Sequence, residues 1–85
     1  KYTFNFTCIC PSDKETISYR ATIETNEMIM VEDINDYIYS LSNEEMFQEN
    51  LTEKIVNAFL YGEGHKVKVT TFGTHQGVEI ECHRQ

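Results

Sequence analysis

The chain has 85 residues, with 14 acidic and 7 basic side chains and a formal net charge of −7 at pH 7. This length fits one domain, residues 1–85, whose core is small for a chain that stands alone. No basic residue lies between Arg20 and Lys54, which argues against nucleic acid as a direct partner. No apolar run reaches the length of a membrane span, and three cysteines show no disulfide-framework spacing. We expect a cytoplasmic protein with no membrane contact.

The first part of the chain has the period of β-strands. Residues 2–10 alternate apolar and polar side chains, and Tyr2, Phe4 and Phe6 share one face. A turn-forming segment at residues 11–14 interrupts the alternation, which resumes over residues 17–24. These two runs predict an antiparallel hairpin with one apolar face.

Two amphipathic helices are expected next. Apolar side chains recur at helical spacing over residues 31–41. The second helix begins either near residue 43 or nearer residue 48, and it runs to about residue 61, where a Gly-Glu-Gly segment ends it. Asn50, followed three residues later by Glu53, has the pattern of a capping box.

The last part of the chain predicts a second hairpin. Residues 67–70 and 78–83 alternate again, with residues 73–77 as the expected turn. The order strand, strand, helix, helix, strand, strand predicts an α+β domain in which two helices cover one face of a four-stranded antiparallel sheet. The other face is polar, which suits either solvent or the wet interior of a multi-subunit barrel whose assembly would remove the open sheet edges. That face carries Thr3, Asn5, Thr7, Arg20, Thr22, Lys68 and Thr70.

A carboxamide and a carboxylate, Gln48 and Glu49, stand side by side near the start of the second helix. A helix N-terminus carries unpaired N–H groups and a partial positive charge, so it favours an ionised Glu49. Together the two side chains offer a hydrogen-bonding edge that a purine or pterin can match. The same pair also fits a solvated helix start, and this segment alone leaves both interpretations open.

The order of these features resembles the tunnelling-fold (T-fold) superfamily, in which two hairpins bracket two helices. Residues 6–11, Phe-Thr-Cys-Ile-Cys-Pro, resemble the Cys-Pro segment of the 7-cyano-7-deazaguanine (preQ0) nitrile reductases of queuosine biosynthesis. Residues 47–50 resemble their Phe-His-Glu-Asp motif, and residues 72–80 resemble their final hairpin. The resemblance spans about residues 6–82. It implies a homo-oligomeric barrel that binds a purine-type or pterin-type heterocycle.

The resemblance also implies roles for individual residues. Cys10 takes the place of the nucleophile that adds to the substrate nitrile, and Asp13 or Glu15 must replace the family's Asp. Glu49 and its neighbour Gln48 stand at positions where the family's residues contact the substrate. Without the resemblance, an inert, half-buried thiol is the better interpretation of Cys10, because no nearby basic group except Lys14 activates it; with the resemblance, the two interpretations are about equal.

Two departures from the family pattern bear on the chemistry. The family's catalytic His falls on Gln48, which cannot transfer a proton at neutral pH. After Glu32 the family has a Ser- and Lys-rich run that holds NADPH, but this chain is acidic there, so we expect no efficient use of NADPH. The related archaeal amidinotransferases also lack that run. Two functions remain open: an enzyme using Cys10, or a non-catalytic binding or structural T-fold that keeps the Glu49 anchor.

Histidines and cysteines outside these motifs give weak signals. The Cys8-Ile9-Cys10 segment and the Cys82-His83 pair do not have usual zinc spacing, so no metal site is predicted. His65 and His83 are expected to be solvent-exposed polar residues. His75 is expected in the turn of the last hairpin, and the resemblance gives it a possible second role in substrate binding, since hairpin turns line T-fold interfaces.

Overall fold

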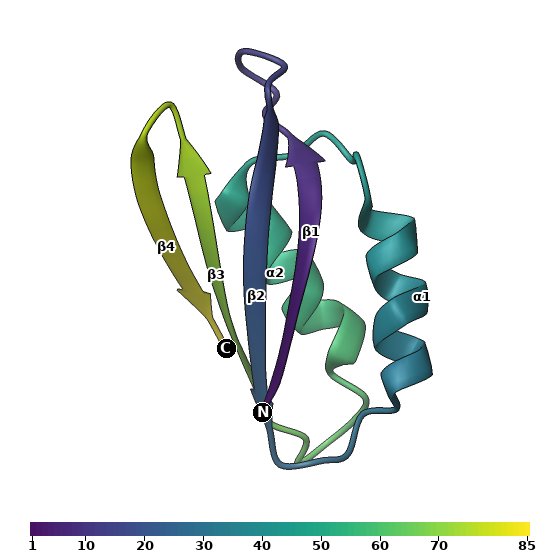
Figure 1. The fold of residues 1–85 in the computed structure, drawn as a ribbon. Helices are drawn as coiled ribbons and strands as arrows, with labels where there is room; N and C mark the ends of the chain where they lie inside the picture. The colour runs from purple at the N-terminus through teal and green to yellow at the C-terminus, as the bar shows by residue number, and fades with distance from the viewer.

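The structure, a computed structural model, describes residues 1–85. One antiparallel sheet has the strand order β1-β2-β3-β4, and both helices lie on the same face of it (Figure 1). The predicted α+β architecture, two hairpins bracketing two helices, is confirmed. The elements are β1 (Tyr2–Ile9), β2 (Thr16–Thr25), α1 (Val31–Leu41), α2 (Gln48–Phe59), β3 (Val67–His75) and β4 (Val78–Arg84).

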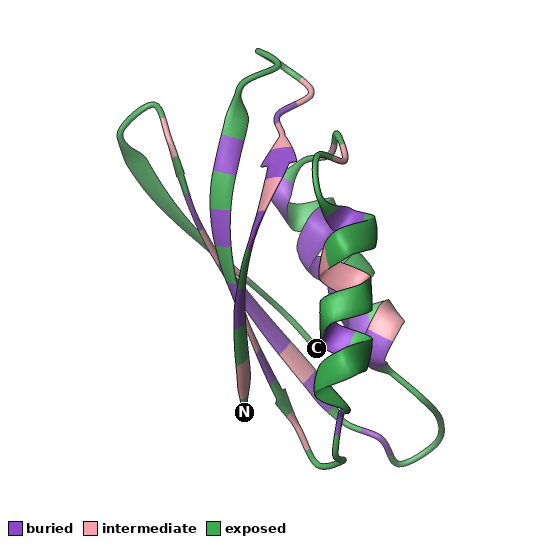
Figure 2. Ribbon diagram, turned by 45° about the vertical axis from the view of Figure 1, so that its right-hand side comes forward, coloured by how far each residue is buried: buried purple, intermediate pink, exposed green.

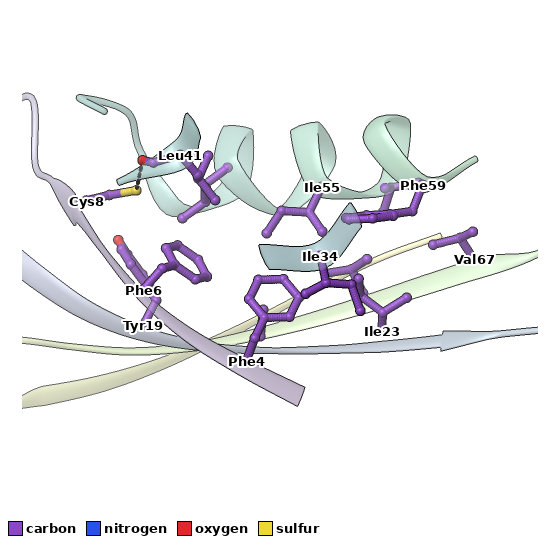
Figure 3. Close-up of a cluster of buried hydrophobic side chains, with 14 of the residues drawn as sticks. Phe4, Phe6, Cys8, Tyr19, Ile23, Ile34, Leu41, Ile55, Phe59 and Val67 are labelled. Atoms are coloured by element: carbon purple, nitrogen blue, oxygen red, sulfur yellow. Dashed lines mark hydrogen bonds between the residues drawn. The ribbon is translucent and has the colours of Figure 1, made fainter. Parts of the chain in front are cut away.

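The core lies between the sheet and the helices. Buried and exposed residues alternate along β1 and β2, as the sequence pattern predicts, and the outer face of α1 is exposed (Figure 2). From α2, Leu51 and Ile55 are fully buried, and Ile55 lies across the core from Phe4 of β1 (Figure 3). Burying each such side chain contributes about 1.5–3 kcal/mol. The cluster joins 17 buried residues into one core.

The second helix begins at Gln48, the later of the two expected starts, and Phe47 is its N-cap with no side-chain cap. The predicted capping box at Asn50 was wrong, because Asn50 already lies inside the helix. The segment before the helix explains why α2 begins at Gln48. The N–H of Ile9 donates to Glu44 O (2.8 Å), and the N–H of Met46 donates to Ile9 O (3.1 Å), so the chain stays extended beside β1 until Phe47.

The third strand is longer than predicted. Residues 73–75, expected in the turn, continue β3, and Gly73 pairs with Ile80 of β4. The turn is reduced to Gln76 and Gly77, with φ of 52° and 81°, as a two-residue type I′ hairpin turn requires. Glycine suits position 73 because the ring of Tyr19 lies over it, and a Cβ there would come within 2.5 Å of that ring.

Three chain segments meet at one end of the sheet. The β1–β2 turn, the β3–β4 turn and the N-terminus of α2 all lie at the upper end in Figure 1, while both termini lie toward the other end. The segments that carry the candidate residues are therefore brought together. Neither helix is long and apolar enough to cross a membrane.

Candidate functional site

A pocket of about 160 Å³ opens where these segments meet. Four of the five predicted site residues line it: Cys10, Gln48, Glu49 and His75. The fifth, Asp13, lies in the adjoining β1–β2 turn and contacts His75. The sequence did not indicate the apolar part of the wall, which Ile17, Tyr19, Met46, Phe47 and Ile80 supply.

Cys10 follows the last residue of β1 and is 6% exposed. Its N–H donates to Glu15 O, and its own carbonyl accepts from the N–H of Lys14, both at 2.9 Å. These two bonds close the turn between β1 and β2 and fix the backbone on which the thiol stands. The side chain is more deeply buried than the half-buried thiol expected at a strand end.

Asp13 joins the two hairpins. Its Oδ1 accepts the N–H of Glu15 (3.0 Å), and its Oδ2 accepts from Nε2 of Gln76 (2.9 Å) and from Nε2 of His75 (2.6 Å). The Glu15 N–H, followed by the side chains of His75 and Cys10, lowers the pKa of Asp13 from 3.8 to about 2. The carboxylate is therefore ionised at neutral pH and fixes the β3–β4 turn against the β1–β2 turn.

A thiol, a carboxylate and an imidazole thus gather beside the pocket. Cys10 Sγ, an Asp13 oxygen and a His75 ring nitrogen lie within 4.8 Å of one another. These side-chain types also occur as metal ligands, but His75 and Asp13 are already hydrogen-bonded to each other here, and we assign no metal to them. The arrangement can bring a nucleophile and two proton-accepting groups to one small molecule.

Gln48 connects α2 to the sheet. It is 8% exposed, and its Nε2 lies 3.2 Å from Thr71 O, 3.1 Å from Thr71 Oγ1 and 3.0 Å from Ile80 O. Thr52 Oγ1 donates to Gln48 O and lies 2.7 Å from Thr71 Oγ1. The amide nitrogen is committed to β3 and β4, so only the carbonyl oxygen of this side chain remains for a ligand.

Glu49 is exposed in the first turn of α2. None of the five ion pairs of the chain involves it, so its carboxylate is available to a ligand. In contrast, the acidic residues Glu44 and Glu45 just before α2 pair with Lys54 and Lys14. Glu49 is the unpaired anion at the edge of the pocket.

The expectation that His65 is exposed was wrong. His65 is 9% exposed, its Nδ1 accepts the N–H of Tyr61 (2.9 Å), and its Nε2 lies 2.7 Å from Thr25 Oγ1. The glycines before it, Gly62 and Gly64, suggested an open loop, but this loop folds back onto the end of β2. His83 is exposed as expected and pairs with Glu81 on β4.

The other two thiols lie away from the pocket wall. Cys8 on β1 and Cys82 on β4 belong to opposite edge strands of the sheet, so one chain cannot gather them around one ion. Cys8 is fully buried and its Sγ–H donates to Leu41 O (3.6 Å, Figure 3), and burial raises its pKa to about 11. Burial also raises the pKa of Cys82. All three cysteines are free.

The start of α1 is acidic, as the sequence indicates. Glu32 and Asp33 are exposed in its first turn, and its last turn has no basic residue. This helix presents no cationic group where the resembling family holds the phosphates of NADPH.

The low pKa of Asp13 predicts a pH-dependent contribution to stability. Because the folded-state pKa is below the unfolded one, the contribution is complete above pH 3.8 and is lost as the pH falls toward 2. Asp13→Asn should therefore lower the Tm at neutral pH but not near pH 2, as followed by circular dichroism. Asp36→Asn, on the exposed side of α1, is the control. An equal loss for Asp13→Asn at both pH values would contradict the prediction.

Comparison with known proteins supports the fold. No protein-family model and no curated protein matches the sequence. Among solved structures, the chain is similar to the crystal structure of the archaeosine synthase QueF-like in the apo form, with 21% identity, a TM-score of 0.87 and coverage of 98% of this chain and 87% of that one. At this identity the likeness shows the fold. The chain has the T-fold that its sequence resembles, the fold of an archaeosine synthase QueF-like protein.

Proposed function

We propose that this protein binds a flat purine-type or pterin-type heterocycle in the pocket between its hairpins, and that Cys10 adds to an electrophilic carbon of that ligand. The observation that carries the proposal is that Cys10, just after β1, and Glu49, in α2, line one pocket. The fold shared with an archaeosine synthase QueF-like protein supports it. The substrate class that fits best is a 7-deazaguanine bearing a nitrile, such as 7-cyano-7-deazaguanine.

Glu49 provides the anchor. An exposed carboxylate without an ion-pair partner can accept two N–H bonds from the amino and ring nitrogens of a guanine-like edge. The helix N-terminus beside it favours the ionised form. The carbonyl oxygen of Gln48 offers a third acceptor on the same edge, while the rings of Tyr19 and Phe47 supply apolar wall for a flat ligand.

Cys10 provides the nucleophile. When its sulfur attacks a nitrile, a C–S bond forms, one π bond of the nitrile breaks, and the thiol proton ends on the nitrile nitrogen. The product is a thioimide, in which no atom is lost and nothing is oxidised or reduced. Among the three thiols only Cys10 lines a pocket beside a carboxylate and an imidazole.

The acidic start of α1 favours chemistry other than hydride transfer. Glu32 and Asp33 would repel the phosphates of NADPH, and no basic residue in that helix offsets them. Of the two enzyme types that the sequence resembles, an amidinotransferase-like group transfer from the thioimide therefore fits better than a reduction.

A non-catalytic binding protein is the second candidate, and Gln48 favours it. The position where the reductases carry a histidine holds a buried amide bonded to Thr71 and Ile80. A protein that kept only the Glu49 anchor would bind the heterocycle without forming a covalent bond.

Assembly into a homo-oligomer would complete the site. The pocket of one chain is smaller than the roughly 300 Å³ at which ligand sites usually begin. The outer strand β4 exposes Val78 and Ile80, at 59% and 40%, and Ile80 is part of the pocket wall. A second copy packed along this open edge would bury both side chains and close the pocket.

Replacing Glu49 tests the anchor. Glu49→Ala should weaken binding of 7-cyano-7-deazaguanine by about 10- to 100-fold, because loss of a charge-assisted hydrogen bond costs about 1.5–3 kcal/mol. Calorimetric titration measures the affinity. Glu53→Ala, one turn further along the exposed side of α2, should bind as the wild type does. Equal affinity in the Glu49 variant and the wild type, or binding in neither, ends the proposal.

Mass spectrometry of the intact protein tests the nucleophile. Incubation with 7-cyano-7-deazaguanine should add the whole mass of the nitrile to the wild type and to Cys82→Ala, and nothing to Cys10→Ala, because addition releases no leaving group. If the wild type binds the heterocycle but gains no mass, the non-catalytic candidate is correct.

Sedimentation analysis tests the assembly. At micromolar concentration the wild type should sediment as an oligomer, because β1 and β4 leave two open sheet edges. Ile80→Lys places a charge on the exposed edge and should shift the population toward monomer while far-ultraviolet circular dichroism is unchanged. A wild type that sediments only as a monomer would refute assembly.

A further inference from the structure

The reaction proposed above needs a group that moves a proton, and α2 does not supply one. Gln48, beside the Glu49 anchor, is an amide whose nitrogen is committed to Thr71 and Ile80. An amide does not exchange protons near neutral pH. The pKa of Asp13 is lowered to about 2, so its carboxylate is a weak proton acceptor at neutral pH. The imidazole of the same pocket is that of His75.

His75 comes to this pocket from the other hairpin. It is the last residue of β3, and the two-residue turn at Gln76 and Gly77 fixes its position. Its Nε2–H donates to Asp13 Oδ2 at 2.6 Å, and Gln76 donates to the same oxygen. The carboxylate thereby sets the orientation and tautomer of the ring and leaves the lone pair on Nδ1, which has no hydrogen-bond partner in the chain.

We infer that His75 is the proton-transfer partner of Cys10 and that Asp13 is its positioning residue. The inference rests on the proposed function and assigns its proton steps. The geometry is the cluster in which Cys10 Sγ, the Asp13 carboxylate and a His75 ring nitrogen lie within 4.8 Å of one another at the wall of one pocket. Imidazole is the side chain that exchanges protons near neutral pH.

The proton balance of the step is simple. The thiol proton moves to the ring of His75 as sulfur attacks the nitrile carbon. The C–S bond forms, one π bond to nitrogen breaks, and the imidazolium gives its proton to that nitrogen. Asp13 stabilises the imidazolium without being protonated itself, because the Glu15 N–H and the Gln76 amide continue to donate to it.

The charged and titratable groups around His75 are few. Asp13 and Glu15, whose Oε2 lies 3.9 Å from Nε2, face it from the β1–β2 turn. Cys10, Tyr19 and Glu49 share the pocket from β1, β2 and α2. No cationic side chain lines the pocket.

The test follows alkylation of Cys10, which needs no heterocycle. Iodoacetamide, with a chelator present, modifies the thiolate, and tandem mass spectrometry distinguishes Cys10 from Cys8 and Cys82. The rate is measured between about pH 5 and 9, the range in which an imidazole changes charge. His75→Gln keeps a side-chain N–H to donate to Asp13 but cannot exchange a proton. His83→Asn is the matched control, because His83 also pairs with a carboxylate, Glu81, away from the pocket.

His75→Gln should lower the Cys10 rate at neutral pH by about tenfold or more and remove the neutral inflection from its pH profile, and His83→Asn should change neither. Added imidazole should restore the rate in His75→Ala. A wild-type profile in His75→Gln, or a loss of thermal stability with an unchanged profile, overturns the inference. Two results distinguish this inference from the proposed function. If the nitrile adduct forms equally fast in His75→Gln and in the wild type, only the role of His75 is refuted. If no adduct forms but alkylation of Cys10 depends on His75, only the proposed function is refuted.

Discussion

A short pairing between the end of β1 and the segment before α2 sets the geometry on which the site depends. Ile9 exchanges backbone hydrogen bonds with Glu44 and Met46, which holds that segment extended and delays the helix until Gln48. Cys10 directly follows Ile9, and Glu49 lies three residues after Met46. These main-chain bonds therefore fix the backbone at Cys10 relative to the start of α2, which carries Glu49.

The buried polar contacts beneath α2 keep the helix in that position. Gln48, Thr52 and Thr71 share hydrogen bonds in a part of the core where Thr52 and Thr71 have no exposed surface. Each such bond contributes about 0.5–1.5 kcal/mol, but an unpaired buried group would cost more, so the three residues act together. They fix the rotation of α2 about its axis, which keeps Glu49 outside the core and at the edge of the pocket.

Much of the fold could be predicted from the sequence, because one-sided burial leaves a clear period. The alternation in residues 2–10 and 17–24 and the helical spacing in residues 31–41 are direct consequences of a sheet covered on one face. The errors share a cause. The capping box was wrong because the pairing of Ile9 with the preceding segment determines where α2 begins, and the predicted turn was too long because Gly73 pairs with Tyr19 and Ile80. Contacts between residues far apart in sequence decided both, and local patterns do not record them.

The same limit applied to the site. Cys10 and Glu49 could be chosen because each belongs to a local motif, and the structure brings both to one pocket. The contact between Asp13 and His75 joins residues 62 positions apart, and no spacing rule predicts it. His65 looked exposed for the same reason: its partner Thr25 lies 40 positions away in the sequence.

The amide at Gln48 and the imidazole at His75 are physically related. The amide nitrogen of Gln48 carries two N–H donors and makes three contacts with Thr71 and Ile80, whereas a neutral imidazole at position 48 would have one N–H donor and could not make all three. A chain that uses this position for packing must obtain an acid–base group from elsewhere if it keeps the chemistry. The short β1–β2 turn makes this possible, because it carries Asp13 three residues after Cys10, within reach of the opposite hairpin. In the proposed mechanism, packing and reactivity are thus divided between the helix and the two turns, and neither role has to be weakened for the other.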